Sequence, residues 1–308
     1  MSETRSQKLP NLTVQQLEYL VAAVDHPTRA AAAATLRVTP SALTQGLADL
    51  DRRVGLPLFE RHGRHIELRQ QAQEVLTHAR RVVAETRDFA RWAVAQRTGS
   101  SGLVRLGTID AVAVQHRAEA IRAFHRDRPE IDLHLTVAPS GNLLESLLSG
   151  ELDLIVCVEP ETTPEGVLFA HCFDEPLHVY APEGEFRRSP RNWGPWVTFP
   201  AGSHTRAVVA TALTNAGAPF EVVAESNQPE VLREMVRLGL GWTVLPPIAG
   251  AAVSGGMATA RVEPVAHRHL VVGRREGSPP DPAVDALATA LVGPETDPRP
   301  ASGSSRGR

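Results

Sequence analysis

Cysteine is scarce in this sequence, which has only Cys157 and Cys172 among its 308 residues. Two thiols cannot form the disulfide framework of a small secreted domain, and such sparse use fits a reducing compartment. Both lie in apolar runs, LDLIVCV and VLFAHCF. That setting favours inert buried thiols, with a redox pair as the alternative.

Long apolar runs are also missing. No stretch approaches the roughly 20 apolar residues that are needed to span a bilayer. The N-terminal sequence MSETRSQKLPNLTVQQLEYL has no uninterrupted apolar segment followed by a small-residue cleavage site, which an export signal would have. We therefore expect a cytoplasmic protein without a membrane partner.

Several motifs of catalysis and metal binding are absent. The sequence contains no GxGxxG, no GxxxxGK followed by Ser or Thr, and no HExxH. Two histidine pairs, His62 with His65 and His267 with His269, lack a complementary set of cysteines or carboxylates at ligand spacing. We expect no enzyme activity, no cofactor and no metal.

Lysine is almost missing, since Lys8 is the only one and arginine supplies the other positive charges. Residues 1–97 carry 14 Lys and Arg against 10 Asp and Glu, whereas residues 98–308 carry 18 against 25. The net charge is therefore +4 in the first part and -7 in the second. A basic segment on an acidic body fits a phosphate-binding head, although charge alone does not decide this.

The N-terminal region has the signals of helix, helix, turn, helix and wing. Thr13 and Thr39 are placed as N-caps, Pro40 suits the first position of a helix, and Gly55 stops the third helix. The expected elements are helices over residues 12–24, 28–36 and 40–54, followed by two short strands around His62-Gly63-Arg64.

The third expected helix carries small and polar side chains opposite its apolar face. Ser, Thr and Gln on such a face can contact base edges and phosphates in the major groove of DNA. An ordinary buried helical hairpin is the alternative, but it would not need the arginine-rich wing that follows. The exposed face is expected to contain Pro40, Ser41, Thr44, Gln45 and Ala48.

Residues 72–96 form a longer expected helix with a heptad stripe. The apolar positions recur at spacings of three and four, which favours pairing with a partner helix. A single amphipathic helix lying on its own domain is the alternative. TGSSG at 98–102 is typical of a flexible joint. The expected dimerisation residues are Val75, Ala79, Val82, Thr86 and Phe89, and the stripe also includes Ala72 and Ala93.

Strands and helices alternate in the rest of the chain, which predicts parallel sheets with helices on their faces. The pattern restarts after a Pro- and Gly-rich stretch at 180–195, so we expect two α/β subdomains. The expected strands are 103–109, 131–137, 152–158, WVTF, FEVVAES, WTVLP and 269–274. One expected helix ends before Pro129, and the others cover 143–148, 204–215, 231–238 and 282–292.

At this point the sequence resembles the LysR-type transcriptional regulators. The likeness is carried by LTVQQLEYLVAAV, TRAA, VTPSALTQGLADLD and VGLPLFERHGR in that order, and by SGELDLIV and RLGLGWTVLP further on. It implies a winged helix-turn-helix, a linker helix that forms a dimer or tetramer, and an α/β sensor of two Rossmann-like subdomains, similar to type II periplasmic binding proteins. Operator DNA, a small-molecule effector and RNA polymerase are the implied partners.

The expected boundaries follow from this order of elements. They are a DNA-binding domain at 12–69 with its helix-turn-helix at about 28–47, a linker and hinge at 70–100, and a sensor at 101–293. Within the sensor, the first subdomain covers about 101–180 and 267–293, and the second covers about 181–266. We expect the Pro-, Ser-, Gly- and Arg-rich tail at 294–308 to be disordered.

The chain departs from the family pattern in its DNA-binding region. His26-Pro27 stands where the family usually has an aromatic residue, and the family often has a basic residue at the place of Gly46, Ala48 or Asp49. Phosphate contacts should then shift to arginines outside that face. The expected DNA-binding residues are Arg29, Thr39, Pro40, Ser41, Thr44, Gln45, Arg52, Arg53, Arg61 and Arg64.

Four strand-to-helix loops fit the ligand cleft of such a sensor. Helix N-termini offer unpaired N–H groups there, which favours an anionic ligand such as a carboxylate. Asp110 could hold an amino group, which would favour an amino acid, or it could simply cap a helix. The expected effector-binding residues are Thr108, Asp110, Ser140, Asn142, Ser203, His204, Thr205 and Gln228.

Two other functions compete with this prediction. A solute-binding protein or a metabolic enzyme domain would explain the C-terminal two thirds, but neither needs residues 12–69. A DNA-coating architectural protein would explain the head, but it has no use for four polar helix starts. The leading hypothesis is a nucleoid-associated, effector-controlled transcription regulator.

Overall fold

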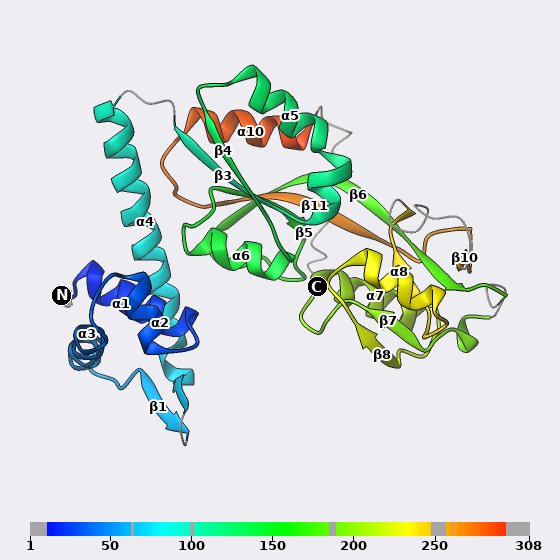
Figure 1. Ribbon diagram of the computed structural model, residues 1–308, viewed down its shortest axis with the longest axis horizontal. Helices are drawn as coiled ribbons and strands as arrows, with labels where there is room; N and C mark the ends of the chain where they lie inside the picture. Colours follow the sequence, from blue (N-terminus) through cyan, green and yellow to red (C-terminus); the bar gives the residue numbers. More distant parts are fainter. Residues whose placement is uncertain are drawn as a thin grey trace, which may run out of the picture. The chain divides into compact units, whose positions relative to one another are not determined.

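The computed structural model describes residues 11–62, 65–98, 102–184, 189–247, 257–260 and 262–293 (Figure 1). It divides into two compact units, which are described separately below. The first comprises residues 1–100 with 146–151, and the second comprises 101–145 with 152–308. Most of the joint expected at 98–102, and the whole tail expected to be disordered, lie outside the described residues.

Three short helices form the head of the first unit, as the capping signals predicted. Thr13 and Gln16 form a reciprocal capping box, and Thr39 accepts a hydrogen bond from the backbone N–H of Ala42. Gly55 ends the third helix with a left-handed backbone, at a φ of 83°. The helices are α1 (Val14–Asp25), α2 (Arg29–Thr35) and α3 (Pro40–Val54).

An antiparallel wing follows α3, with strands β1 (Phe59–His62) and β2 (His65–Leu68) in register from Phe59↔Leu68 to His62↔His65. The head has one apolar core, to which all three helices and the start of the wing contribute. Its fully buried members include Leu20, Leu43, Leu50 and Leu58.

The long helix α4 (Gln73–Thr98) follows a 3-10 turn at Gln70–Ala72 and packs against α1. This packing involves part of the predicted dimer seam. Ala79 is completely buried in the head core, and Val75 packs against the same core. Ala79 therefore completes the core of its own domain, and the part of the seam that contacts a second chain stays a prediction. Val82 and Phe89, in contrast, are 38% and 63% exposed.

The second unit is built on a seven-stranded sheet. Six of its strands follow the order β10-β6-β11-β5-β3-β4, and the seventh, β9, pairs with β6 outside this order. The predicted parallel pairing holds for three of these strands, whereas the others pair antiparallel. The parallel strands are β3 (Leu103–Thr108), β4 (Asp132–Val137) and β5 (Leu154–Val158); β6 (Val167–Pro182) and β11 (Ala266–Arg275) are antiparallel to each other.

Helices cover both faces of the parallel strands, which form the first subdomain (Figure 1). One face carries α5 and α10, and the other carries α6. Gly107 allows the close approach on the α6 side, because a Cβ there would lie 2.7 Å from a side-chain carbon of Leu143. The helices are a π-helical turn η2 (Val112–His116), α5 (Ala118–Asp127), α6 (Ser140–Leu148) and α10 (Pro282–Val292).

The second subdomain has a tryptophan-rich core. Trp193, Trp196 and Trp242 are buried, and Trp196 donates a hydrogen bond to the carbonyl oxygen of Pro219 at 2.7 Å. The subdomain contains α7 (His204–Asn215), α8 (Pro229–Arg237), a 3-10 turn at Pro190–Asn192, the parallel pair β7 (Trp196–Thr198) and β8 (Val222–Glu225), and strands β9 (Thr243–Leu245) and β10 (Met257–Thr259).

Strand β6 joins the two subdomains. Its first part pairs with β11 beside the parallel strands, and its last residues pair with β9 and β10 in the second subdomain. The sequence patterns predicted no strand over Val167–Pro182. The antiparallel partners β6 and β11 therefore form the connection between two subdomains that the sequence predicted as separate units.

Candidate DNA-binding and effector sites

The predicted recognition face of α3 is exposed. Ser41, Thr44 and Gln45 are open to solvent, while Leu43 and Leu47 on the opposite face are buried. The Thr44 hydroxyl donates to the carbonyl oxygen of Pro40 at 2.8 Å. The side-chain amide of Gln45 is therefore the most adaptable polar group on this face, because it carries both donors and an acceptor.

The arginines that are predicted to contact phosphates differ in their partners within the protein. Arg52 forms an ion pair with Asp49, three residues earlier on α3, and Arg53 donates to the carbonyl oxygen of Asn11. Arg29 instead stacks on the ring of Phe59. The side chains of Arg61 and Arg64, and residue 64 as a whole, lie outside the described part of the chain.

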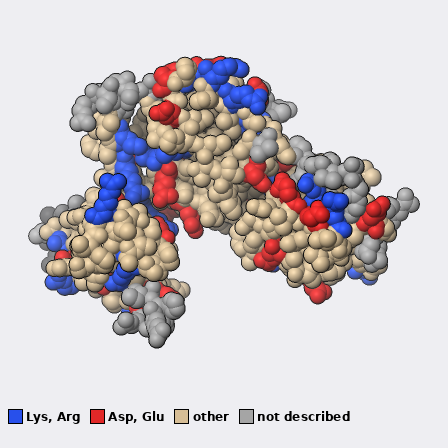
Figure 2. Space-filling model, in the orientation of Figure 1, with Lys and Arg blue, Asp and Glu red and all other residues tan. Residues whose placement is uncertain are grey.

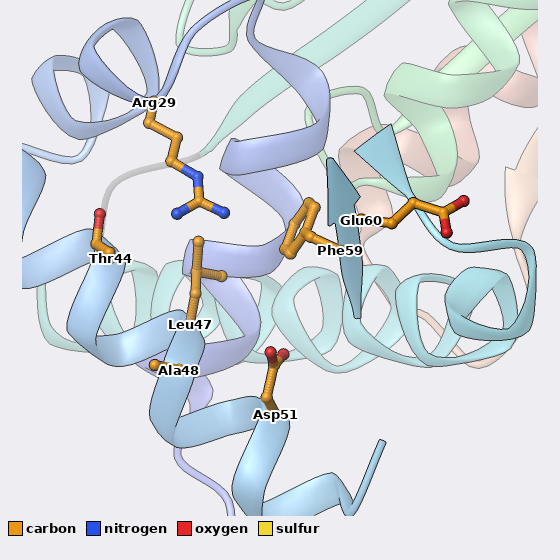
Figure 3. A pocket seen from close by; sticks show the side chains of 7 residues that line it. All are labelled: Arg29, Thr44, Leu47, Ala48, Asp51, Phe59 and Glu60. Atoms are coloured by element: carbon orange, nitrogen blue, oxygen red, sulfur yellow. The ribbon is translucent and has the colours of Figure 1, made fainter. Parts of the chain in front are cut away.

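A groove of about 400 Å³ lies between α3 and the wing (Figure 3). The Arg29 guanidinium reaches into it beside Leu47 and Phe59. The Asp51 carboxylate lies at the far end, where it accepts a hydrogen bond from the backbone N–H of Leu58 at 3.3 Å. The small side chain of Ala48 lines the groove and keeps it open.

The structure also explains two departures from the family pattern. His26, which replaces the usual aromatic residue, links two helices, because its ring nitrogens lie 3.0 Å from the carbonyl oxygen of Ala22 and 3.0 Å from the hydroxyl of Thr35. Gly46 lies under the ring of Tyr19. A Cβ at position 46 would come within 2.4 Å of that ring, so a basic residue cannot fit there without a shift of Tyr19.

Two of the four predicted effector loops meet at Val158, the last residue of β5. Its backbone N–H donates to the Ser140 hydroxyl at 3.2 Å, and its carbonyl oxygen lies 3.0 Å from Nδ1 of His204. Ser140 starts α6 in the first subdomain, and His204 starts α7 in the second. These two side chains thus bond to the protein itself and connect the subdomains.

A buried ionic cluster connects the subdomains a second time. Arg268 on β11 and Glu175 on β6 are 5% and 3% exposed, and Arg268 Nε donates to Glu175 Oε2 at 2.6 Å. Arg268 also donates to the Thr205 hydroxyl at 3.0 Å, and His116 Nε2 lies 2.5 Å from Glu175 Oε1. Of these four residues, only Thr205 was predicted from the sequence as a site residue.

Glu175 has its pKa lowered in this cluster. Burial by itself would raise the pKa of this carboxyl, but the hydrogen bond from His116 and the charge and hydrogen bond of Arg268 outweigh it. Glu175 is therefore held as a carboxylate. The positive charge of Arg268 is correspondingly neutralised inside the protein.

The remaining predicted effector residues differ in their hydrogen bonds and in their exposure. Ser203 accepts a hydrogen bond from the backbone N–H of Arg206 and so caps α7, whereas Asn142 and Gln228 are exposed. The Thr108 hydroxyl is fully buried and has no hydrogen-bond partner among the described residues.

Asp110 follows Thr108 by two residues and is partly buried. Its carboxylate accepts a hydrogen bond from the backbone N–H of Ala111 at 2.8 Å. This bond resembles helix capping, which was the alternative to binding an amino group. Burial raises the pKa of Asp110, while the charge of Arg268 lowers it and that of Glu230 raises it. Asp110 is thus a desolvated acid beside a neutralised arginine.

The two cysteines are not positioned to form a disulfide. Strand β11 runs between β5, which carries Cys157, and β6, which carries Cys172. Both thiols are buried, and burial raises the pKa of Cys157 to about 12. The geometry thus favours two inert buried thiols over a redox pair.

Charges of both signs are spread over the sensor unit, and basic side chains run along α4 (Figure 2). None of the helices in the described ranges is both long enough and apolar enough to cross a membrane. The same ranges contain no group of three His, Cys, Asp or Glu residues that could hold a metal ion.

A winged helix-turn-helix head joined to a two-lobed α/β sensor defines a class of DNA-binding regulators. The family model described as "LysR substrate binding domain" matches residues 97–293, and that of the "bacterial regulatory helix-turn-helix protein, lysR family" matches residues 14–73. The chain therefore belongs to the LysR family. It is a LysR-type DNA-binding transcriptional regulator with an effector-binding domain.

Curated relatives span nearly the whole chain. The DNA-binding transcriptional dual regulator OxyR of Escherichia coli is 26% identical over 290 residues, covering 91% of this chain and 95% of that protein. The regulator CbbR of Xanthobacter flavus is 26% identical over 280 residues, covering 87% and 84%.

Solved structures share the fold. A full-length OxyR variant from Pseudomonas aeruginosa has a TM-score of 0.62 and 23% identity, covering 91% of this chain and 94% of that one. Full-length CbnR complexed with its target DNA has a TM-score of 0.57 and 20% identity, covering 91% and 99%.

Proposed function

We propose that the chain recognises a specific operator through the exposed face of α3 and is controlled by a small carboxylate or amino acid that binds between its two sensor subdomains. Two heads, paired through the linker helix in a dimer or tetramer, engage two half-sites and act on RNA polymerase. The observation that carries this function is the exposed polar face of α3 on a fully packed winged head.

Gln45 is the residue that tests operator reading. Its amide can donate to and accept from one base edge, so Gln45→Ala should relax discrimination at one position of each half-site by roughly 1–3 kcal/mol. A binding selection from random duplexes measures this. Gln73→Ala is the matched control, because Gln73 is an exposed glutamine at the start of α4. An unchanged preference in Gln45→Ala would rule out this face.

The effector proposal is supported by Asp110 in the first loop. Ser140, His204 and Thr205 already bond to protein atoms, whereas the partly exposed Asp110 carboxylate, which accepts a hydrogen bond from the backbone N–H of Ala111, has further acceptor capacity for a ligand. The Thr108 hydroxyl, two residues earlier, is buried and has no hydrogen-bond partner among the described residues. Because burial raises the pKa of Asp110, a ligand with an ammonium group would favour its charged form. An amino acid, whose carboxylate can meet helix N–H groups while its ammonium meets Asp110, fits better than a plain carboxylate.

A thermal-shift screen of amino acids and small carboxylates on the full chain tests the effector. Asp110→Asn should abolish the shift produced by amino acids, and Thr108→Val should reduce it. Both variants should bind operator normally without ligand. Operator and ligand should alter each other's affinity by the same factor, typically about 5–150-fold. Hits that shift Asp110→Asn as much as the parent would show that the site lies elsewhere.

The two thiols do not fit peroxide sensing, although some relatives are named hydrogen peroxide-inducible genes activators. A peroxide-sensing cysteine needs an accessible thiolate. Cys157 is fully buried with its pKa raised to about 12, and Cys172 lies on the far side of β11.

A further inference from the structure

Arg29 differs from Arg52 and Arg69 in the group that its guanidinium contacts. Arg52 is paired with Asp49, and Arg69 lies 3.9 Å from Glu60. No carboxylate oxygen of the described residues lies within the 4.0 Å ion-pair distance of Arg29. Its guanidinium carbon instead lies 5.3 Å from the centre of the Phe59 ring, which is within the range of a cation–π contact.

The ring that holds Arg29 is itself fixed. Phe59 starts the wing, directly after the fully buried Leu58, and it pairs with Leu68 across the wing. Its carbonyl oxygen accepts a hydrogen bond from Arg69 Nε at 3.3 Å. Phe59 therefore offers a stable flat surface to the guanidinium.

The stacked guanidinium lies at the α3 side of the groove. Figure 3 shows it beside Thr44 and Leu47, whereas the Glu60 side chain points away from it. Thr44 belongs to the exposed face of α3 that is proposed to enter the major groove. The positive charge is thus presented next to the recognition helix, while the acidic groups lie at the other end.

We propose that Phe59 is a positioning residue for DNA binding, whose ring holds the Arg29 guanidinium beside α3 for contact with a backbone phosphate. The proposal rests on the proposed recognition of DNA by α3. A guanidinium over the ring keeps several N–H groups free at its edge for a phosphate, whereas a lysine ammonium must turn some of its three N–H groups toward the ring. Stacking removes rotamer freedom before DNA arrives, so less is lost on binding.

A double-mutant cycle on the full chain tests the positioning. The probe is a fluorescent mixed-sequence duplex of about 30 base pairs, since phosphate contacts do not depend on sequence. Arg29→Ala should lower the slope of log affinity against log salt by about 0.9 for each head bound. Phe59→Leu should weaken binding about two- to fivefold in the parent and have no effect in Arg29→Ala.

Two further variants separate positioning from folding. Phe59→Tyr keeps the ring and should bind like the parent. Arg29→Lys leaves Phe59 intact and keeps the charge, so it should weaken binding about two- to fivefold without changing the salt slope.

The outcomes distinguish the inference from the function on which it rests. If Phe59→Leu weakens binding equally with and without Arg29, or if Arg29→Lys binds like the parent, the ring does not position Arg29 and the inference is overturned. If selection from random duplexes enriches no sequence for the parent, the proposed DNA recognition itself fails.

Discussion

Removing one partner of the ion pair between Glu175 and Arg268 should destabilise the sensor more than removing one partner of a surface pair, because both side chains are almost fully buried. Glu175→Gln removes the negative charge and leaves the guanidinium of Arg268 buried without a counter-ion. Breaking one partner of a buried pair typically costs about 3–5 kcal/mol. We expect a loss of that size in the free energy of unfolding of the sensor unit.

A surface pair in the same unit gives the matched control. Arg274 Nη1 lies 3.2 Å from Asp285 Oδ1, and the two side chains are 52% and 54% exposed. Asp285→Asn should therefore cost only about 0–1 kcal/mol. The double variant Glu175→Gln/Arg268→Met should recover much of the loss, because a neutral pair leaves no uncompensated charge.

Urea unfolding followed by tryptophan fluorescence can report on the sensor alone. Trp193, Trp196 and Trp242 are buried in the second subdomain, so a Trp92→Phe background removes the only tryptophan of the head and linker. A separate signal is needed because a chain of two units does not unfold in one step.

The pH dependence gives a second check. Because the pKa of Glu175 is lowered in the fold, its stabilisation is complete above the ordinary glutamate pKa and is lost as the pH falls through the lowered value. The difference between parent and Glu175→Gln should hold at neutral pH and shrink below about pH 4. Equal losses in Glu175→Gln and Asp285→Asn at pH 7 would refute the reasoning.

Three further predictions concern the head and the thiols. Gly46→Ala should destabilise the head by about 1–3 kcal/mol in thermal unfolding, and Tyr19→Leu should relieve part of that loss; an undiminished loss would contradict the overlap. Thr39→Ala should cost about 0.5–2 kcal/mol through loss of the N-cap, and an unchanged stability would contradict it. Cys157→Ser and Cys172→Ser should leave any response of DNA binding to peroxide unchanged, and a response lost in either variant would restore the redox alternative.

The head was predictable because its signals are local. Thr13 and Thr39 cap helices through backbone N–H groups three residues later, Pro40 is the first residue of α3, and Gly55 ends α3 by its own backbone conformation. The exposed face of α3 followed from the same periodicity. The contacts beside this face could not be predicted from periodicity, because the contact of Arg29 with the Phe59 ring joins α2 to the wing, which no short sequence pattern relates.

The connection between the subdomains was not predictable in this way. Strand β6 interrupts its apolar pattern with His171, Asp174 and Glu175, and such residues argue against a buried strand. Glu175 is tolerated because it pairs with Arg268, which lies 93 positions later. Only the fold brings these charges together, so the cluster that most clearly joins the two subdomains left no trace in any sequence window.

The heptad stripe of α4 shows the same limit and gives the last prediction. Periodicity identified an apolar face but not its partner, and the structure assigns Ala79 to the chain's own core while Phe89 stays 63% exposed. Phe89→Glu should therefore dissociate the oligomer in sedimentation velocity while the head stays folded, because a charge cannot be buried between two helices without a counter-ion. Ala79→Glu should instead unfold the head, visible by circular dichroism. Thr77→Glu, on an exposed position of α4 outside the stripe, should change neither. A Phe89→Glu protein that sediments like the parent would show that the exposed part of the stripe is not the dimer contact.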